Sequence, residues 1–600
     1  MADDNKATAQ NDGGEGGPDF RRDHADTTGA VRPDLWRQAV AAFLQLDRDA
    51  SVRWEQIGPA PLVVDADPLH MGIGPDSGAV ADLCIDPSGA ADTTIYLATD
   101  NGGIWKTKDA GSNWLAMTDG MPSLTMGAVA MDPANTSLLY AGSGNSFDAG
   151  APFERSAGLY RSVDGGQSWS IVDGGAFGTI LGNLAINRIV CPEANVVLVA
   201  TGNGLYRSVD AGNNFGANAP DYTDRKPLVA GDICCLQLDT ANNGAVYAGV
   251  AGDSVDAGNN PLPTVGLLMS TDKGKTFPTN LFSNPGAPVL PYGSFAFAQS
   301  QLDGATANSA VLYVSVQRTL ANGTPGYVGL YRSLNGGGQW TLRPSLAAVA
   351  AADGLDQTNY DLTLGVDPLN STRVYAGFQQ LWLSTDGGAT FQPTAVSNSK
   401  VHWDNHAIAF SPAGHRGAAA PTQFYTGTDG GVASTSDGGL TWKPLNHLIA
   451  TSLFRGIDIG HGAAGNAYTY GGCQDTGTSG RRPTDAALEW HAGINGDGWQ
   501  VAADPSDATI VYGFDDGYFI KTTNAGAAWQ TTYPNPNNFG VGLTHPSPSD
   551  QHAIALEKTG TVTASRTVYV SEGKVLNKSS DAGLHFAATA LAPGDYITCI

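Results

Sequence analysis

The chain has 600 residues, a formal net charge of −25 and a sequence pI near 4.6. This length exceeds that of one ordinary compact domain, so it predicts either several domains or one large repeat ring. The excess of negative charge argues against nucleic acid or an anionic membrane surface as a partner, and it leaves neutral or cationic ligands.

The composition favours many short strands over long helices. The chain contains 77 glycines and 33 prolines, and all but seven of its 57 acidic residues are aspartate, which suits turns. No apolar run approaches the roughly 20 residues that a membrane helix needs, so no membrane insertion is expected. The N-terminal segment has no stretch of the signal-peptide type. We expect a cytoplasmic protein, or a secreted one whose export signal has been removed.

Two segments precede the main fold. Residues 1–30 are rich in Gly and Asp and have few large apolar residues, which predicts a disordered tail. Residues 31–52 contain "PDLWRQAVAAFLQLDRD", in which the apolar residues recur at helical spacing. We predict a helical strap packed on the following fold, and binding to a partner is the alternative for this helix.

A short phrase then recurs nine times along the chain. It reads Ser or Thr, any residue, Asp or Asn, any residue, Gly, two more residues, then Trp or Phe, as in "SVDGGQSW". Its acidic or amide members are Asp109, Asp164, Asp210, Asp272, Asn335, Asp386, Asp437, Asn524 and Asp581. The steps between them are 46 to 63 residues, with one gap of 87 residues that has room for a unit lacking the phrase. About ten repeat units are therefore expected.

Each unit has the same internal order of elements. A run such as "GAVAMDP" precedes a β-rich run such as "LLYAGSG", then "GLYRS" leads into the phrase, whose aromatic residue begins a fourth run. Four short strands joined by tight turns and repeated around a ring describe the blades of an all-β propeller. In the phrase, Asp hydrogen-bonds turn amides, Gly adopts positive φ and the aromatic packs between blades, so we predict a structural role.

These repeats resemble the Asp-box, or BNR-repeat, propellers, which include sialidases, xyloglucan-specific endoglucanases, sortilin-type receptors and photosystem assembly factors. The resemblance covers roughly residues 50–600 and implies the fold, but these families share a scaffold rather than one chemistry. Two arrangements remain open: one ten-bladed ring, or a seven-bladed propeller over 53–447 followed by blades 8–10 over 448–600. The segment "RWEQIGPAPL" from Arg53 looks like an isolated fourth strand that could complete a C-terminal blade.

Strand order divides the loops of such a blade into two sets. Turns after strands one and three emerge on one face, which carries the repeated phrase, and the remaining loops emerge on the opposite face. We therefore expect ligands on the face formed by second-to-third turns and blade-to-blade connections.

Two aspartates on that face are the candidate catalytic pair. "YLATDNGGIWKT" looks like the xyloglucanase segment in which a catalytic Asp precedes Gly-Gly, which would assign that role to Asp100. Asp429 lies in a second "TDGG" and is the candidate partner, since glycoside hydrolysis uses two carboxyl groups. The family places its second Asp in a second complete propeller, for which this chain lacks the length. A simple turn Asp is the alternative interpretation for both residues.

The stretch "HWDNH" is the candidate metal site. If it lies in a strand, His402, Asp404 and His406 project to one side, and they could hold a divalent ion with Asp475 or Asp497 completing the shell. A hydrogen-bonded polar strand in which Asp404 orients a histidine is the alternative. Trp403 is a candidate binding residue, although packing between blades is the favoured interpretation of its indole.

Further candidate binding residues follow second strands or begin first strands in the C-terminal repeats, namely Asp475, Asp497 and Asp516. A sialidase is disfavoured because no Arg-Ile-Pro occurs in the chain. Two functions remain. The first is a protein resembling glycoside hydrolases that binds or hydrolyses a glycan through paired Asp residues, and the second is a non-catalytic scaffold that binds a protein, peptide or glycan.

Overall fold

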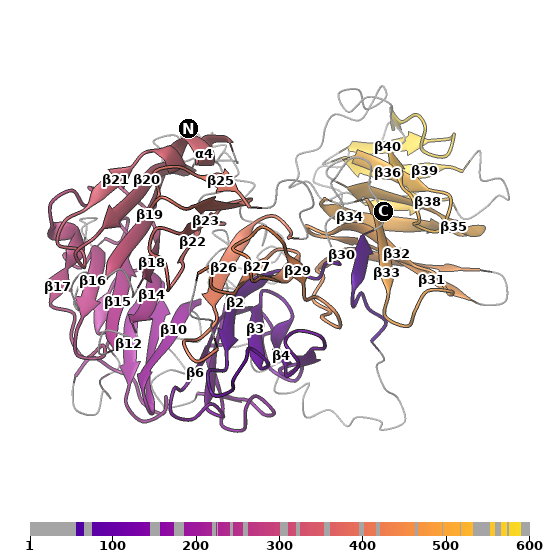
Figure 1. Ribbon diagram of the computed structural model, residues 1–600. Helices are drawn as coiled ribbons and strands as arrows, with labels where there is room; N and C mark the ends of the chain where they lie inside the picture. The colour runs from indigo at the N-terminus through magenta and orange to yellow at the C-terminus, as the bar shows by residue number, and fades with distance from the viewer. Residues whose placement is uncertain are drawn as a thin grey trace, which may run out of the picture. The chain divides into compact units, whose positions relative to one another are not determined.

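The computed structural model of the chain is shown in Figure 1. It describes residues 56–64, 75–144, 156–172, 185–218, 224, 226–239, 244–255, 262–300, 310–319, 325–352, 360–394, 401–415, 420–462, 466–494, 496–515, 518–531, 553–557, 566–572 and 575–589. The predicted tail over 1–30 and the predicted strap over 31–52 lie outside these residues.

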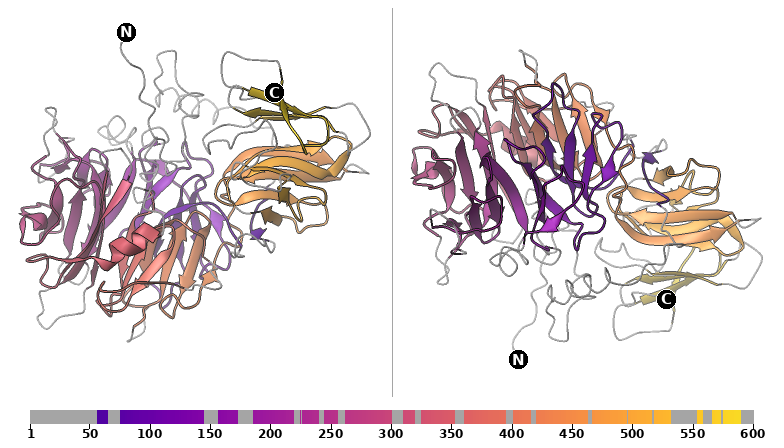
Figure 2. Two further views of the ribbon diagram at one scale, coloured as in Figure 1. Left: turned by 90° about the horizontal axis from the view of Figure 1, so that it is seen from above. Right: turned by 90° about the horizontal axis from the view of Figure 1, so that it is seen from below.

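The described strands form ten sheets that fall into two compact units. Unit 1 lies within residues 80–396 and 403–445, and unit 2 lies within 51–79, 397–402 and 446–600. In unit 1 seven sheets of four strands follow one another around a ring, as Figures 1 and 2 show. Within the described residues, seven sheets therefore group in unit 1 and three in unit 2.

The strands of unit 1, sheet by sheet, are β2 Val80–Ile85, β3 Ile95–Thr99, β4 Gly103–Thr107 and β5 Leu115–Ala116; β6 Met126–Met131, β7 Leu139–Ser143, β8 Leu159–Ser162 and β9 Ser170–Ile171; β10 Ile186–Glu193, β11 Val196–Thr201, β12 Gly204–Ser208 and β13 Val229–Ala230; β14 Ile233–Asp239, β15 Ala245–Val250, β16 Gly266–Ser270 and β17 Thr279–Asn280; β18 Phe295–Ser300, β19 Val311–Thr319, β20 Pro325–Ser333 and β21 Thr341–Arg343; β22 Thr363–Val366, β23 Val374–Gly377, β24 Leu381–Ser384 and β25 Gln392–Pro393; β26 Asn405–Phe410, β27 Phe424–Thr428, β28 Gly431–Thr435 and β29 Lys443–Pro444. Short helical segments are η2 Leu281–Ser283 and α4 Ser345–Ala352.

The second strands of the unit 1 sheets are buried along nearly all of their length, because a neighbouring sheet covers each of their faces. Strand β3, with the sequence "IYLAT", is buried at every position. A fully buried tyrosine recurs in these second strands. In two sheets its hydroxyl bonds to the next sheet: Tyr96 Oη donates to Gly165 O at 3.0 Å and Tyr313 Oη to Ser371 O at 2.8 Å. Burying such a side chain stabilises the fold by roughly 1.5–3 kcal/mol.

The repeated phrase forms the turn between the third and fourth strands, as the strand bounds show. In the second sheet Ser162 Oγ donates to Asp164 Oδ1 at 2.8 Å and accepts from Gly166 N at 2.8 Å. The amide of Ser168 donates to the same Asp164 oxygen at 2.9 Å. Gly166 has φ +87°, a left-handed conformation that glycine adopts without a steric penalty. The aspartate therefore serves as an acceptor inside its own turn.

Unit 1 closes on itself because its first sheet packs against its last. Strand β2 packs against β26 and β27, and the indole Nε1 of Trp114 donates to Leu445 O at 2.7 Å. On the same pair of sheets, buried Asp92 accepts hydrogen bonds from Ser411 and from His415, the latter at 2.7 Å. Residues more than 300 positions apart in the sequence thus join the ends of the ring.

Unit 2 contains three sheets within the described residues. The first has the order β1-β33-β32-β31-β30, and the others are β34 to β37 and β38 to β41 in chain order. Their strands are β1 Leu62–Val64, β30 Phe454–His461, β31 Ala467–Cys473, β32 Gly477–Arg481, β33 Trp490–Ile494, β34 Gly498–Asp504, β35 Asp507–Asp515, β36 Tyr518–Thr522, β37 Gln530–Thr531, β38 Ile554–Leu556, β39 Val568–Glu572, β40 Val575–Ser579 and β41 Ala587–Ala588. Strands β30 to β33 of the first sheet lie in the 87-residue gap between copies of the phrase.

The segment after Arg53 does not supply the fourth strand of a blade. Strand β1 pairs parallel with β33, with Leu62 opposite Trp490, and so becomes a fifth strand beside a complete four-stranded sheet. Residues 56–64 and 75–79 consequently group with unit 2, although the sequence places residues 53–447 in one propeller.

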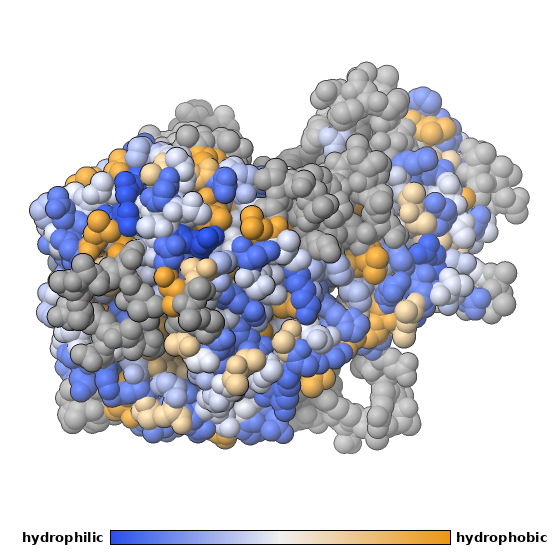
Figure 3. Space-filling model, in the orientation of Figure 1, coloured by the Kyte–Doolittle hydropathy of each residue, from blue (hydrophilic) through white to orange (hydrophobic). Residues whose placement is uncertain are grey.

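The surface agrees with the acidic composition. The face shown in Figure 3 is mainly hydrophilic, with hydrophobic residues scattered over it. Among the described residues, exposed hydrophobic side chains include Val163 and Leu334, at the second position of a repeated turn, and Leu440, at the sixth. A search of the described residues finds no helix with the length and apolar character needed to span a membrane.

Candidate functional site

Asp100 is a partly exposed carboxylate on the turn between β3 and β4 of the first sheet. The Thr99 hydroxyl closes this turn, because Thr99 Oγ1 donates to Gly103 O at 2.9 Å and accepts from Gly102 N at 3.1 Å. The side-chain Nδ2 of Asn101 donates to Asp100 Oδ2 at 2.7 Å. This turn lies at the opposite end of the sheet from the repeated phrase, as the strand order predicts.

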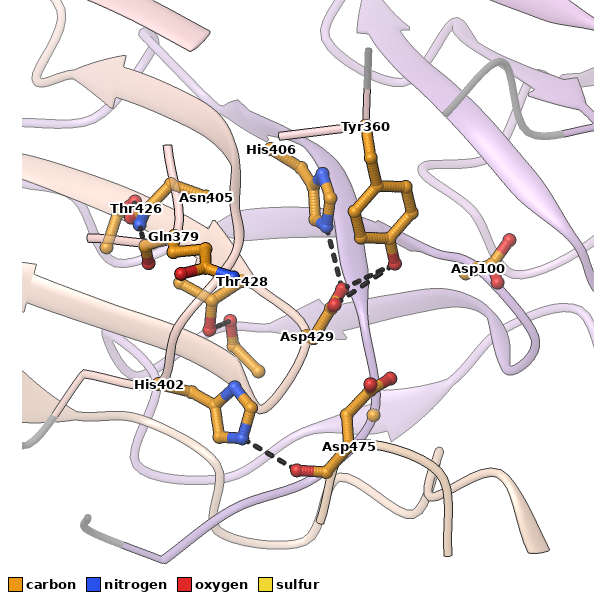
Figure 4. A network of polar contacts seen from close by, with 12 residues as sticks. Asp100, Tyr360, Gln379, His402, Asn405, His406, Thr426, Thr428, Asp429 and Asp475 are labelled. Atoms are coloured by element: carbon orange, nitrogen blue, oxygen red, sulfur yellow. Dashed lines mark hydrogen bonds and ion pairs between the residues drawn. The ribbon is translucent and has the colours of Figure 1, made fainter. Parts of the chain in front are cut away.

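Asp429 occupies the equivalent turn, between β27 and β28, of the neighbouring seventh sheet. Its side chain is buried, and both of its oxygens accept hydrogen bonds (Figure 4). His406 Nε2 lies 2.7 Å from Oδ1, and the hydroxyl of Tyr360 donates to Oδ1 at 3.1 Å and to Oδ2 at 3.0 Å. The side chains of His406 and Tyr360 therefore fix the position of this carboxylate.

His406 is the cation of this cluster. Its side chain is 2% exposed, and the ring of Tyr360 lies edge-on to it with centroids 4.8 Å apart. Burial lowers the pKa of His406, but the nearby carboxylates of Asp429, Asp361 and Asp100 outweigh that effect and raise the pKa above its ordinary value. These carboxylates therefore favour the protonated form of the ring, which lies against Asp429.

A second carboxyl pair lies beside the imidazole. Asp361, on the connection into β22, is 1% exposed, and burial raises its pKa to about 7, although its hydrogen bond with Asp404 and the charge of His406 oppose that rise. Two carboxyl groups hydrogen-bond to each other only when one of them carries a proton. Asp361 is therefore a buried carboxyl group beside Asp404 whose pKa burial raises.

The predicted metal-binding strand over 402–406 is wrong. Strand β26 begins at Asn405, and Asp404 precedes it with φ +59°, so the alternating geometry that would align the three side chains is absent. His402 belongs to unit 2, whereas Asp404 and His406 belong to unit 1. Among the described residues no group of three or more His, Cys, Asp or Glu side chains could hold a metal ion. Asp404 interacts with Asp361 instead of orienting a histidine in a strand.

The candidates of unit 2 form a separate hydrogen-bonded group. His402 Nε2 lies 2.9 Å from the backbone oxygen of Asp475, as Figure 4 shows, and the Asp475 amide donates to Asp497 Oδ1 at 3.0 Å. Asp475 lies on the β31–β32 turn, the position that Asp100 has in unit 1. Arg455 stacks 4.0 Å above the Trp499 ring, and its Nη1 lies 3.9 Å from Asp497 Oδ2. Asp497 thus supports the turn that carries Asp475.

Two predicted binding residues remain. Trp403 is 46% exposed. Its indole is therefore not buried between blades, which was the favoured interpretation. Asp516 lies outside the described residues.

Sequence reasoning missed Tyr360 and Asp361. Both stand immediately before a first strand, in "NYDLTLGVDP", on a connection of the type expected to bear ligand-binding residues. That position was the available signal, but nothing in the local sequence indicates that Asp361 contacts Asp404 or that Tyr360 contacts Asp429.

Comparison with known proteins shows the fold. No family model matches the chain. A xyloglucanase from Hypocrea jecorina (strain QM6a) is 27% identical over 359 residues, which cover 54% of this chain and 39% of that protein, so the match spans well under half of the relative's length. The GH74 xyloglucanase from Xanthomonas campestris aligns with a TM-score of 0.53 at 17% identity, covering 90% of this chain and 81% of that one. A GH74 enzyme from Niastella koreensis aligns with a TM-score of 0.52 at 17% identity, covering 89% and 81%. The chain therefore has a β-propeller fold similar to that of these solved structures.

Proposed function

We propose that the chain is a glycoside hydrolase-like propeller that binds and cleaves a β-glucan polysaccharide of the xyloglucan class at the loop face of unit 1. The similarity to a xyloglucanase supports the substrate class. The observation that carries the site assignment is Asp100, a partly exposed carboxylate on a second-to-third turn, beside the buried Asp429–His406 pair.

In this proposal Asp100 is the carboxylate that touches the glycan. Asp429, the other member of the predicted pair, is less suited to donate a proton because His406 and Tyr360 both donate to it. A general acid must carry a proton at the working pH, and an imidazolium–carboxylate pair opposes that state. In this proposal Asp429 therefore acts as a hydrogen-bond acceptor held by His406 and Tyr360. Asp475 in unit 2 is another carboxyl group to be tested.

The direct experiment measures the release of reducing ends from xyloglucan and from unsubstituted β-glucans by the full chain. Asp100→Asn should lower kcat by at least ~100-fold while xyloglucan still binds, because general acid–base contributions are of that size. Asp475→Asn is assayed alongside it. Asp386→Asn, which alters a repeated turn at the opposite end of a unit 1 sheet, is the control and should leave turnover unchanged. Equal turnover by wild type and Asp100→Asn would remove Asp100 from the reaction.

The second candidate function is a non-catalytic glycan-binding scaffold with Asp-box blades. It is favoured because both oxygens of Asp429 already accept hydrogen bonds from His406 and Tyr360. Asp429 is therefore less suited to serve as the second catalytic carboxyl group of unit 1. This function predicts micromolar binding of xyloglucan oligosaccharides by calorimetry with no release of reducing ends, and weaker binding by Asp100→Asn. Hydrolysis by the wild-type chain would exclude it.

A further inference from the structure

We propose that Asn101 is a positioning residue of the loop face: its side-chain amide holds the carboxylate of Asp100 in one orientation and is itself anchored by Thr125, on the connection into β6. This inference rests on the proposed function for its catalytic consequence. The hydrogen bonds that carry it are contacts within unit 1 and do not depend on that function.

The turn that bears Asn101 is longer than its counterpart in the seventh sheet. Thr99 pairs with Gly103 in the first sheet, so the β3–β4 turn comprises residues 100–102. Thr428 pairs with Gly431 in the seventh sheet, so the β27–β28 turn comprises residues 429–430. In both turns the threonine hydroxyl donates to the carbonyl of the paired glycine, at 2.9 Å and 3.2 Å respectively. Asn101 is the middle residue of the longer turn, directly after the candidate carboxylate.

The main chain of this turn is held by its surroundings. The indole Nε1 of Trp105 donates to Gly102 O at 2.9 Å. Gly103 N donates to Leu124 O at 2.7 Å, which joins the turn to the connection that enters β6. None of these bonds involves the carboxylate of Asp100, so they fix the path of the chain but not the side-chain torsions of that residue.

The Asn101 side chain joins the carboxylate to the neighbouring connection. Its Nδ2 donates to Asp100 Oδ2 at 2.7 Å, and its Oδ1 accepts from Thr125 Oγ1 at 3.4 Å. The groups themselves dictate this arrangement of the amide, because an ionised carboxylate only accepts hydrogen bonds whereas a threonine hydroxyl can donate one. Thr125 is 5% exposed and stands immediately before β6. A buried hydroxyl therefore anchors the amide that donates to the carboxylate.

The two loop-face aspartates are thus held by different kinds of donor. Asp429 is buried and accepts from the imidazole of His406 and the hydroxyl of Tyr360. Asp100 is partly exposed and accepts from an amide, which orients a carboxylate without forming an ion pair with it. Catalytic groups act only within about 0.5 Å of their productive positions. Loss of the Asn101 amide should therefore slow the reaction even though no contact with a glycan is removed.

The catalytic consequence is measured by steady-state kinetics of the full chain on xyloglucan. Asn101→Ala should lower kcat roughly 10-fold or more and change KM less than about twofold, because a misplaced carboxylate slows the reaction while the glycan contacts remain. Thr125→Val removes the longer and weaker bond and should lower kcat roughly threefold. Thr125→Ser keeps the hydroxyl and should retain the wild-type rate.

The matched control is Asn203→Ala in the third sheet. Asn203 lies on the β11–β12 turn, where the preceding residue is Gly202 and there is no carboxylate to orient. This variant should leave kcat unchanged. A loss in Asn203→Ala equal to that in Asn101→Ala would show a general effect of these turns and would contradict the proposal.

A double-mutant cycle tests whether Thr125 acts through Asn101. The variant that combines Asn101→Ala with Thr125→Val should be no slower than Asn101→Ala alone, because the same chain of contacts is already broken. Losses that multiply would mean that the two residues act separately and would count against the anchoring role of Thr125. A higher KM with an unchanged kcat in Asn101→Ala would indicate direct glycan binding by Asn101 and would overturn the inference.

Crystal structures of the variants report the orientation of Asp100 without any reaction. In Asn101→Ala the carboxylate should rotate or lose defined density while the main chain of the turn stays in place, and in Thr125→Ser it should lie as in the wild type. An unchanged Asp100 side chain in Asn101→Ala would refute the positioning role. If the wild-type chain hydrolyses no glycan, the proposed function fails, and this structural comparison still decides the inference. Thermal unfolding confirms that each variant folds.

Discussion

The buried ion pair between Arg566 and Asp504 in unit 2 allows a stability prediction of known size. Arg566 Nε donates to Asp504 Oδ2 at 2.8 Å and Nη2 to Oδ1 at 2.7 Å, and both side chains are at most 2% exposed. The guanidinium also donates to Glu557 O at 2.6 Å and to Ser506 Oγ at 2.8 Å. It thereby joins the sheet of β34 to the sheet that begins with β38.

Arg566→Met keeps much of the side-chain volume but leaves the Asp504 charge buried without its cation. Removing one partner of a buried pair costs about 3–5 kcal/mol, because the remaining charge has lost its compensation. Burial opposes the ionisation of Asp504, but the hydrogen bonds from Arg566 and Ser506 outweigh it and lower its pKa. This contribution to stability is therefore present above the ordinary aspartate pKa and is lost as the pH falls through the lower folded value.

Hydrogen exchange at pH 7, resolved by peptide, localises the effect to these sheets. A loss of about 3 kcal/mol should lower protection in β34–β36 and β39–β40 by roughly 100-fold, since each 1.4 kcal/mol is tenfold. The matched control is Lys273→Met in unit 1, where the Lys273–Glu193 pair is similarly short at 2.8 Å but its side chains are 43% and 34% exposed. That change should cost less than about 1 kcal/mol. Equal effects of the two substitutions would refute the argument from burial.

Three further predictions concern single carboxyl groups. Asp92→Asn should destabilise unit 1 by about 3 kcal/mol in chemical denaturation, because buried Asp92 accepts from Ser411, His415 and Tyr425; a change below about 1 kcal/mol would contradict this. Burial raises the pKa of Asp76 to about 7, although the charge of His402 opposes this rise. The folded state therefore binds an extra proton between about pH 4 and 7, and its stability should fall as the pH rises through that interval. In Asp76→Asn the melting temperature should decline less over that interval, and an unchanged decline would count against the assignment. Hydrogen bonds within its turn outweigh burial and lower the pKa of Asp386 to about 2, so its stabilisation is lost as the pH falls from about 4 to 2; an acid melt of Asp386→Asn should lack that part of the loss.

The blade scaffold could be predicted from the sequence because its signals are local. The phrase around Asp164 contains both the acceptor and the donors of its turn within a few residues, and it marks the end of a third strand wherever it occurs. Strand order then assigns Asp100 and Asp429 to second-to-third turns without knowledge of any distant contact. The same reasoning failed at 402–406, where a strand pattern was extended past the point at which Asp404 adopts a positive φ.

The candidate site depended on contacts that local patterns do not encode. Tyr360, His406 and Asp429 come from different connections and strands, and they meet because their sheets are adjacent in the ring. Asp100 reaches this group only because the first sheet packs against the seventh.

By itself, the sequence determined the repeating strands, their turns and the rim on which polar loop residues emerge, since each of these depends on residues within one repeat. The tertiary structure alone decided that seven sheets close into a ring, that β1 adds to a sheet of unit 2, and which carboxyl groups are paired. Ring closure depends on packing between residues hundreds of positions apart, and the charge state of a buried group depends on every group that surrounds it.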